Sequence, residues 1–284
     1  MKIQRIIIIS FILLCISVAS YTQDKRTTET KVADLLARLP ANDLQFTEKL
    51  MEDMLSLGES GIKQICDQIV PAGTGDDTSP RFAVESITRY LSRKGKETEK
   101  GMWEKICIGY ATGQKDNGVK DFYMKQLQLI GSNQSAEAMK IYLTGKELCE
   151  PALAVITAVG GQTAETILAE SLKSRELPCA ATVMNALAIL KSQIAVNEYI
   201  TWAAGGDINI KASAYNALAQ SGSPLAYPVL SKAAKEVSYR WEITGATASL
   251  LNFANVIGQN GDIKTSDKIC KLINGLHSRF SYCR

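Results

Sequence analysis

Apolar side chains in the second half of the chain recur at helical spacing. In the segment 179–191, Leu187 and Leu190 lie four and seven positions after Val183, so the three share one face of an α-helix. The same order of apolar and small residues returns without a gap in the segment 210–222. A fixed period of this length indicates stacked repeats, because one helical unit cannot bury its apolar face alone.

The period is 31 residues between these two copies and 28 residues further upstream. Met184–Ala188 matches Tyr215–Ala219, and Gln134–Met139 resembles Gln162–Ile167. Strand-like alternation of apolar and polar residues is not evident. We therefore predict an all-α fold, an α-solenoid of stacked helical hairpins over residues 31–275, with the best-defined repeats in 134–262.

The two ends of the chain differ from this pattern. Residues 21–30 are polar and predict a linker. Residues 276–284 do not form the polar capping helix that a repeat stack requires. This suggests a tail at which the stack is truncated, and an ordinary chain end is the alternative.

The N-terminus predicts an export signal over residues 1–20. Lys2 and Arg5 precede the apolar run Ile6–Val18, which is shorter than the roughly 20 residues needed to span a bilayer. Small residues follow at Ala19 and Ser20. We expect a periplasmic or extracellular protein with no membrane span after signal cleavage. A lipoprotein anchored through Cys15 and an uncleaved anchor are the alternatives.

The charge balance argues against two classes of partner. The chain has 32 basic and 29 acidic residues, and the predicted signal contributes two bases and no acids. A nearly neutral mature chain lacks the basic face that nucleic acid or an anionic membrane surface requires.

Six cysteines remain after the signal, without a close pair or a metal-ligand spacing. Most lie in apolar helical patterns, which favours small buried side chains. A disulfide between adjacent repeats is the alternative, since an exported protein can oxidise its thiols.

No catalytic constellation is evident. The single histidine, His277, lies in the last eight residues, which leaves no base for a nucleophile. Carboxylate pairs such as Asp76-Asp77, or Glu242 with Asp262, arise by chance among 29 acidic residues. Gly160-Gly161 lacks the lysine and the strand of a phosphate loop and indicates a helix end. We predict no enzymatic activity, no metal site and no cofactor.

The repeat register singles out a few polar residues. Asn185 and Asn216 are equivalent in the two copies, and Thr157 aligns with them. Their amides either form a hydrogen-bond ladder between repeats or face a ligand. Lys211 and Gln220 are predicted as more exposed contacts on the same helix.

Three aromatic residues in this region have less specific roles. Tyr215 shares the packing column of Met184 and is predicted in the core. Trp202 and Trp241 lie near helix ends, and either core or rim fits them.

The segment IKASAYNALAQSGSPLAYPVLSKAAKE (210–236) resembles a bacterial HEAT repeat. Gly222 and Pro224 match the usual turn, whereas Ala219 stands where many members have glycine. The resemblance implies an armadillo-type fold whose Ala-rich helices line the concave face.

A narrower resemblance covers residues 73–100, GTGDDTSPRFAVESITRYLSRKGKETEK. This segment is similar to the N-terminal HEAT-like region of exported bacterial proteins that carry a lectin- or glucanase-like domain of the 3-keto-disaccharide hydrolase type. That domain is absent here, so no catalytic residue is carried over. The resemblance implies glycan binding only through the missing domain.

Two functions follow as expectations. The first is an exported, non-catalytic scaffold that binds protein partners on its repeat surface. The alternative is an accessory N-terminal region of a larger carbohydrate-active hydrolase or lyase.

Overall fold

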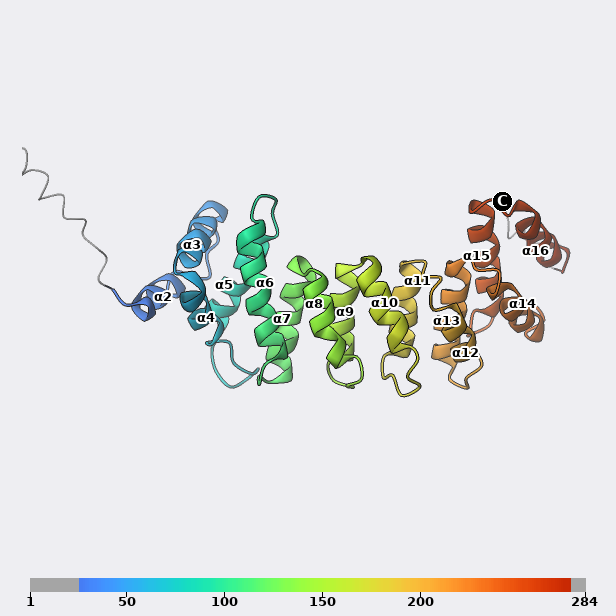
Figure 1. The fold of residues 1–284 in the computed structure, drawn as a ribbon, viewed down its shortest axis with the longest axis horizontal. Helices are drawn as coiled ribbons and strands as arrows, with labels where there is room; N and C mark the ends of the chain where they lie inside the picture. The colour runs from blue at the N-terminus through green and yellow to red at the C-terminus, as the bar shows by residue number, and fades with distance from the viewer. Residues whose placement is uncertain (1–25, 277–284) are drawn as a thin grey trace, which may run out of the picture. The chain divides into compact units, whose positions relative to one another are not determined.

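The computed structural model describes residues 26–276, and all regular structure in that range is helical (Figure 1). The predicted all-α fold of stacked helical hairpins is confirmed. No helix within the described range has both the length and the apolar character needed to cross a membrane. The predicted signal, 1–20, and the tail from residue 277 onward lie outside the described residues.

The chain divides into two compact units. The first holds α2 (Thr28–Leu36), α3 (Leu44–Ser56), α4 (Gly58–Cys66) and the first half of α5 (Thr78–Leu91). Its core centres on fully buried residues of α3 and α4, such as Leu50 and Ile62. Because α2 begins at Thr28, three residues of the predicted linker are helical instead.

The second unit holds the rest of α5 and the eleven following α-helices. Their bounds are α6 (Glu97–Thr112), α7 (Asn117–Ile130), α8 (Asn133–Met139), α9 (Cys149–Val159), α10 (Gly161–Ser171), α11 (Ala180–Ile189), α12 (Val196–Ala203), α13 (Ile208–Ser221), α14 (Ala226–Glu236), α15 (Ala246–Gln259) and α16 (Ile263–Leu276). A 3-10 turn, η1 (Lys140–Tyr142), follows α8.

These helices form two layers. Layer A consists of α7, α9, α11, α13 and α15, each of which contacts the next. Layer B consists of α6, α8, α10, α12 and α14, and α16 packs against α15. The alanines of α11 and α13 are buried between neighbours, which lets helix axes approach to about 8–10 Å. The sequence predicted that each Ala-rich helix pairs with the helix that follows it. In the structure, the Ala-rich helix α13 packs more extensively against α12, which precedes it, than against α14.

Links between successive repeats recur at sequence separations of 28 to 32 residues, close to the predicted period. In layer B, the buried carboxylate of Glu104 accepts a hydrogen bond from the Ser135 hydroxyl at 2.6 Å. In layer A, the hydroxyl of Thr182 donates to Glu150 at 2.8 Å. The stack is thus held by polar links as well as by apolar burial.

The ends of the layer A helices fix their register. Gly160, Lys191 and Gly222 stand 31 residues apart, and each follows its helix with a positive φ, of 65°, 52° and 60°. Gly222, with ψ of 11°, has the left-handed conformation that closes many helices, whereas Gly160, with ψ of −162°, has an extended-type ψ that is suited to glycine. The prediction that Gly160 marks a helix end is confirmed, because it is the C-cap of α9. Lys191 holds a positive φ without the freedom of glycine.

Candidate functional site

A row of carboxamide side chains lies on the exposed side of layer A. Asn185 of α11 and Asn216 of α13 each stand six positions before the left-handed residue that ends the helix. Asn255 of α15 stands six positions before Gly261, which has φ of 100° and occupies the same place. The three asparagines therefore occupy one structural position in three successive repeats.

Hydrogen bonds join the first two of these amides. The Asn216 side chain donates to Oδ1 of Asn185 at 3.4 Å, and Nδ2 of Asn185 donates to the Ser213 hydroxyl at 3.2 Å. The ladder interpretation is confirmed for this pair. It does not extend to Thr157, whose hydroxyl donates to the Leu153 carbonyl of its own helix at 2.8 Å.

Sequence reasoning missed the third repeat of the row. The segments NALAQSG (216–222) and NVIGQNG (255–261) share the pattern Asn-x-x-x-Gln-x-Gly but stand 39 residues apart, so a search at a period of 31 does not align them. The shared pattern itself was the available signal. In the structure, Nε2 of Gln259 donates to Oδ1 of Asn255 at 3.4 Å. We call Asn185, Asn216, Gln220, Asn255 and Gln259 the amide row.

Of the predicted contacts, Gln220 belongs to the amide row and Lys211 does not. The two are nine positions apart on α13, and at about 100° per residue they lie on opposite sides of the helix. Lys211 instead faces layer B, where it lines a groove between α12 and α14.

This α12–α14 groove has a volume of about 520 Å³. Its walls are small and apolar residues with charged groups at the margin, namely Ile200, Ala203, Ala204, Lys211, Tyr215, Pro228, Val229, Lys232, Ala233 and Glu236. Tyr215 is 8 % exposed, which confirms its predicted core position, although one side of it meets the groove. Burial, and then the charges of Glu236 and Glu242, raise the pKa of the Tyr215 phenol, so it remains a neutral donor.

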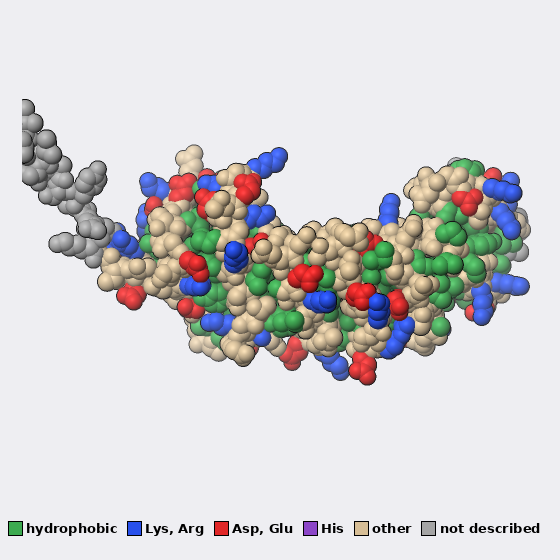
Figure 2. All heavy atoms as spheres, in the orientation of Figure 1, with side chains coloured by type: hydrophobic (Ala, Val, Ile, Leu, Met, Phe, Trp, Pro, Cys, Tyr) green, Lys and Arg blue, Asp and Glu red, His purple; other side chains and the backbone are tan. Residues whose placement is uncertain are grey.

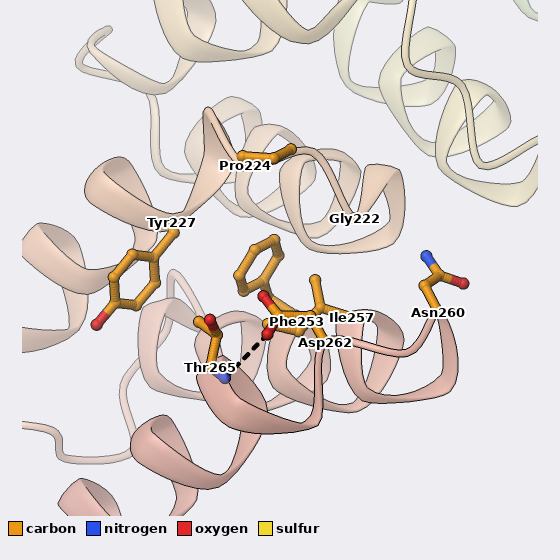
Figure 3. A pocket seen from close by; sticks show the side chains of 8 residues that line it. All are labelled: Gly222, Pro224, Tyr227, Phe253, Ile257, Asn260, Asp262 and Thr265. Carbon is orange, nitrogen blue, oxygen red and sulfur yellow. Dashed lines mark hydrogen bonds between the residues drawn. The ribbon is translucent and has the colours of Figure 1, made fainter.

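A smaller cavity of about 260 Å³ is lined by the Gly222–Pro224 turn and by residues of α14, α15 and the start of α16 (Figure 3). Phe253 and Ile257 lie between the Gly222–Pro224 turn and the start of α16. Its acidic group, Asp262, accepts a hydrogen bond from the backbone N–H of Thr265 at 3.1 Å and so caps α16. The cavity is chiefly apolar, and its carboxylate serves the helix end.

The carboxylates that the sequence analysis considered as pairs each make local contacts that stabilise a loop or a helix end. Glu242 accepts hydrogen bonds from Thr244 and Ala246, while Asp262 caps α16. Asp77 pairs with Arg81 one helical turn later, at 2.8 Å. Among residues 26–276, no group of three histidine, cysteine or acidic side chains has a geometry suited to a metal ion.

For three cysteines the favoured interpretation, unpaired buried side chains, is wrong, and the alternative of a disulfide between adjacent repeats is confirmed for Cys149 and Cys179. Cys149 and Cys179, at the starts of α9 and α11, form a disulfide with Cα atoms 6.2 Å apart, and Cys270 is also disulfide-bonded. Cys149 and Cys179 stand at the starts of two layer A helices that are neighbours in the stack, and this brings the two sulfur atoms together. Cys66 and Cys107 are buried as predicted, at 1 % and 0 % exposure.

For Trp202 and Trp241 the sequence left core and rim positions open, and the structure places one in each. Trp202 is 8 % exposed, and its indole N–H donates to the Leu172 carbonyl at 2.9 Å. Trp241, in the connection between α14 and α15, is 78 % exposed.

No protein-family model matches the chain, and no curated protein is detectably similar to it. Its function is therefore argued from the geometry above.

Proposed function

We propose that this chain is an exported HEAT-type repeat protein that acts as a non-catalytic scaffold and binds a segment of a partner protein along the amide row. The observation that carries the proposal is the return of an asparagine at one exposed position of α11, α13 and α15. Packing within a repeat does not require a carboxamide there, since α9 has Ala154 one period of 31 residues before Asn185.

The chemistry of the row suits a peptide. Each carboxamide offers both a donor and an acceptor, as does each peptide group of an extended chain. Neighbouring helix axes lie about 8–10 Å apart, which corresponds to about three residues of extended chain. The row is uncharged, so it selects for main chain rather than for a charged motif. Ile189, 75 % exposed and equivalent to Gln220, adds one apolar contact.

A site-specific cross-linking experiment tests this function. A photo-reactive amino acid replaces Gln220 or Gln259 in the full chain, expressed in cells of its source. We expect protein adducts from both positions. The matched control carries the same group at Lys173, an exposed residue that follows α10 of layer B.

Two outcomes contradict the proposal. Equal protein adducts from Lys173 and the amide row would mean that the row is not the site. Recovery of glycan without protein from the row would instead favour the accessory region of a carbohydrate-active protein.

A further inference from the structure

The connection between α14 and α15, residues 237–245, presents two large apolar side chains to water. Trp241 and Ile243 are each 78 % exposed, the highest values among the large apolar residues of the described chain. Tryptophan in particular is enriched among the residues that dominate protein interfaces. We call this connection the Trp241 loop.

The loop is held in this form by its own hydrogen bonds. Between the two exposed residues, the Glu242 carboxylate accepts from the Thr244 N–H at 2.6 Å, the Thr244 hydroxyl at 2.7 Å and the Ala246 N–H at 2.8 Å. The Thr247 hydroxyl donates to the Arg240 carbonyl at 2.9 Å. Because these contacts fix the backbone, Trp241 and Ile243 are displayed on a preformed support.

The start of the loop carries backbone strain. Ser238 and Tyr239 both have φ of 54°, a left-handed conformation that side-chain-bearing residues rarely adopt. Two such residues in succession turn the chain sharply after α14. Strain of this kind persists where surrounding contacts over-determine it, and it is often found at functional sites.

The α12–α14 groove adjoins the loop. Glu236, the last residue of α14, lines the groove, and the loop begins at the next residue. Glu242 of the loop is close enough to act on the Tyr215 phenol in the groove. Hydrophobic side chains gather on the surface at this end of the second unit, around α14 and α15 (Figure 2).

The groove is lined by two ammonium groups and one carboxylate, Glu236, so its net charge favours an anion. Lys211 and Lys232 line the groove, and Arg240 belongs to the loop. Lys232 lies 3.9 Å from Glu236, while Lys211 forms no ion pair with any described residue. The Tyr215 hydroxyl has no hydrogen-bond partner among residues 26–276, but the charges that act on it are the carboxylates of Glu236 and Glu242, so the anion is assigned to Lys211.

We propose that the α12–α14 groove and the Trp241 loop together bind a peptide segment of a partner protein in which an acidic side chain is flanked by large apolar ones. The acidic side chain lies near Lys211 and Lys232. The apolar side chains cover Trp241 and Ile243 and the alanine-lined wall. This site is separate from the amide row and does not depend on the function proposed for it.

A peptide-display experiment tests the site. The full chain, immobilised, is panned against a phage library of random 12-residue peptides, with the double variant K211E/K232E panned in parallel. We expect the native chain to enrich peptides with aspartate or glutamate beside leucine, isoleucine or aromatic residues. The double variant is expected to lose that preference and to favour lysine or arginine.

Affinities of one enriched peptide, labelled with fluorescein, provide the second measurement. Trp241→Ser and K211E/K232E are each expected to weaken binding about tenfold or more. Replacing the acidic residue of the peptide with asparagine weakens binding to the native chain but not to K211E/K232E. Ile141→Ser and Lys146→Glu alter comparably exposed residues of the α8–α9 region and leave the affinity unchanged.

The proposal is overturned if no sequence is enriched, if enriched peptides lack acidic residues, or if the variants bind them like the native chain. Circular dichroism of each variant establishes that it is folded. Lys232 and Trp241 are exposed and Lys211 is half-buried on the wall of the groove, so these substitutions leave the helical core intact.

Discussion

Cys149 and Cys179 are covalently joined across one repeat, from the first residue of α9 to the N-cap of α11. Their disulfide closes a loop of 30 residues that contains α10 and most of α9. The link therefore ties two neighbouring layer A helices at the same end.

Loss of this disulfide is expected to destabilise the second unit. Closing a loop of this length restricts the unfolded chain by about 3–4 kcal/mol on the chain-entropy model. Replacing both cysteines with alanine should lower the free energy of unfolding in urea by about that amount. Dithiothreitol should destabilise the native chain more than it destabilises this variant, and an equal response in the two would count against a stabilising role.

Lys191→Gly is expected to stabilise the protein. Lys191 has φ of 52°, whereas the equivalent residue at the end of α13 is a glycine, Gly222, with φ of 60°. The left-handed backbone costs a side-chain-bearing residue about 1–2 kcal/mol, and glycine's greater freedom in the unfolded chain returns about 0.4–1 kcal/mol of that. We expect a net gain of about 0.5–1 kcal/mol, measured by urea denaturation.

The reverse change, Gly222→Ala, provides the contrast. Its Cβ would lie 3.1 Å from both Val256 and Asn260, and φ is 60°. This variant should lose stability. If it were as stable as the native chain, the register of left-handed residues would not explain the helix ends.

Tyr199→Phe is expected to be neutral or stabilising, which is unusual for a fully buried tyrosine. The Tyr199 hydroxyl and the nearby Ser192 hydroxyl are buried without a hydrogen-bond partner among the described residues, and burial raises the pKa of Tyr199. Removing an unsatisfied buried group recovers its desolvation penalty of about 1–3 kcal/mol. Thermal and urea unfolding of the variant measure the effect.

Tyr142→Phe is the matched control for that substitution. The Tyr142 hydroxyl donates to the Ala111 carbonyl at 2.9 Å. Its removal should cost about 0.5–1.5 kcal/mol. Equal losses in both variants would show that the Tyr199 hydroxyl makes a favourable contact.

Acid is expected to loosen the Trp241 loop through Glu242. Burial opposes ionisation of this carboxyl, but hydrogen bonds from Ala246 and Thr244 outweigh burial and lower its pKa from 4.5. A group with a lowered pKa stabilises the folded form above its ordinary value, and that stabilisation disappears as the pH falls through the lowered value. Iodide quenching of Trp241 should therefore stay constant down to about pH 4.5 and change below it.

Glu242→Gln isolates that transition. The variant cannot accept the same charged hydrogen bonds, so its Trp241 quenching should lack the acid step. An identical acid transition in the variant would assign the step to other carboxyls. Trp103 and Trp202 are buried, and subtracting the signal of Trp241→Phe removes their contribution.

The helical architecture was predictable because packing leaves a periodic record. Leu187 and Leu218 fill equivalent seams, and the alanines around them are required wherever a helix has neighbours on two sides. The polar row was only partly predictable, since the third copy is offset from the period. A fixed spacing does not align Asn255 with Asn216, although the local pattern does.

Other features depend on three-dimensional proximity and left no pattern in the sequence. Six cysteines allow fifteen pairings, so the Cys149–Cys179 link could not be chosen from spacing alone. Trp241 is exposed in a loop whose backbone is held by the carboxylate of Glu242, and nothing in the sequence distinguishes Glu242 from other acidic residues. Helix geometry alone predicts that Lys211 and Gln220 lie on opposite sides of their helix, so this result could have been obtained from the sequence.

The 39-residue spacing between Asn216 and Asn255 has a consequence for how this protein can diversify. The eight residues in excess of the period lengthen α14 and the Trp241 loop relative to α12 and its four-residue connection to α13. They leave the layer A helices equal in length, at 14 residues each in α13 and α15. An insertion is thus confined to one margin of a module, where new recognition elements can arise without changing the alignment of the repeats.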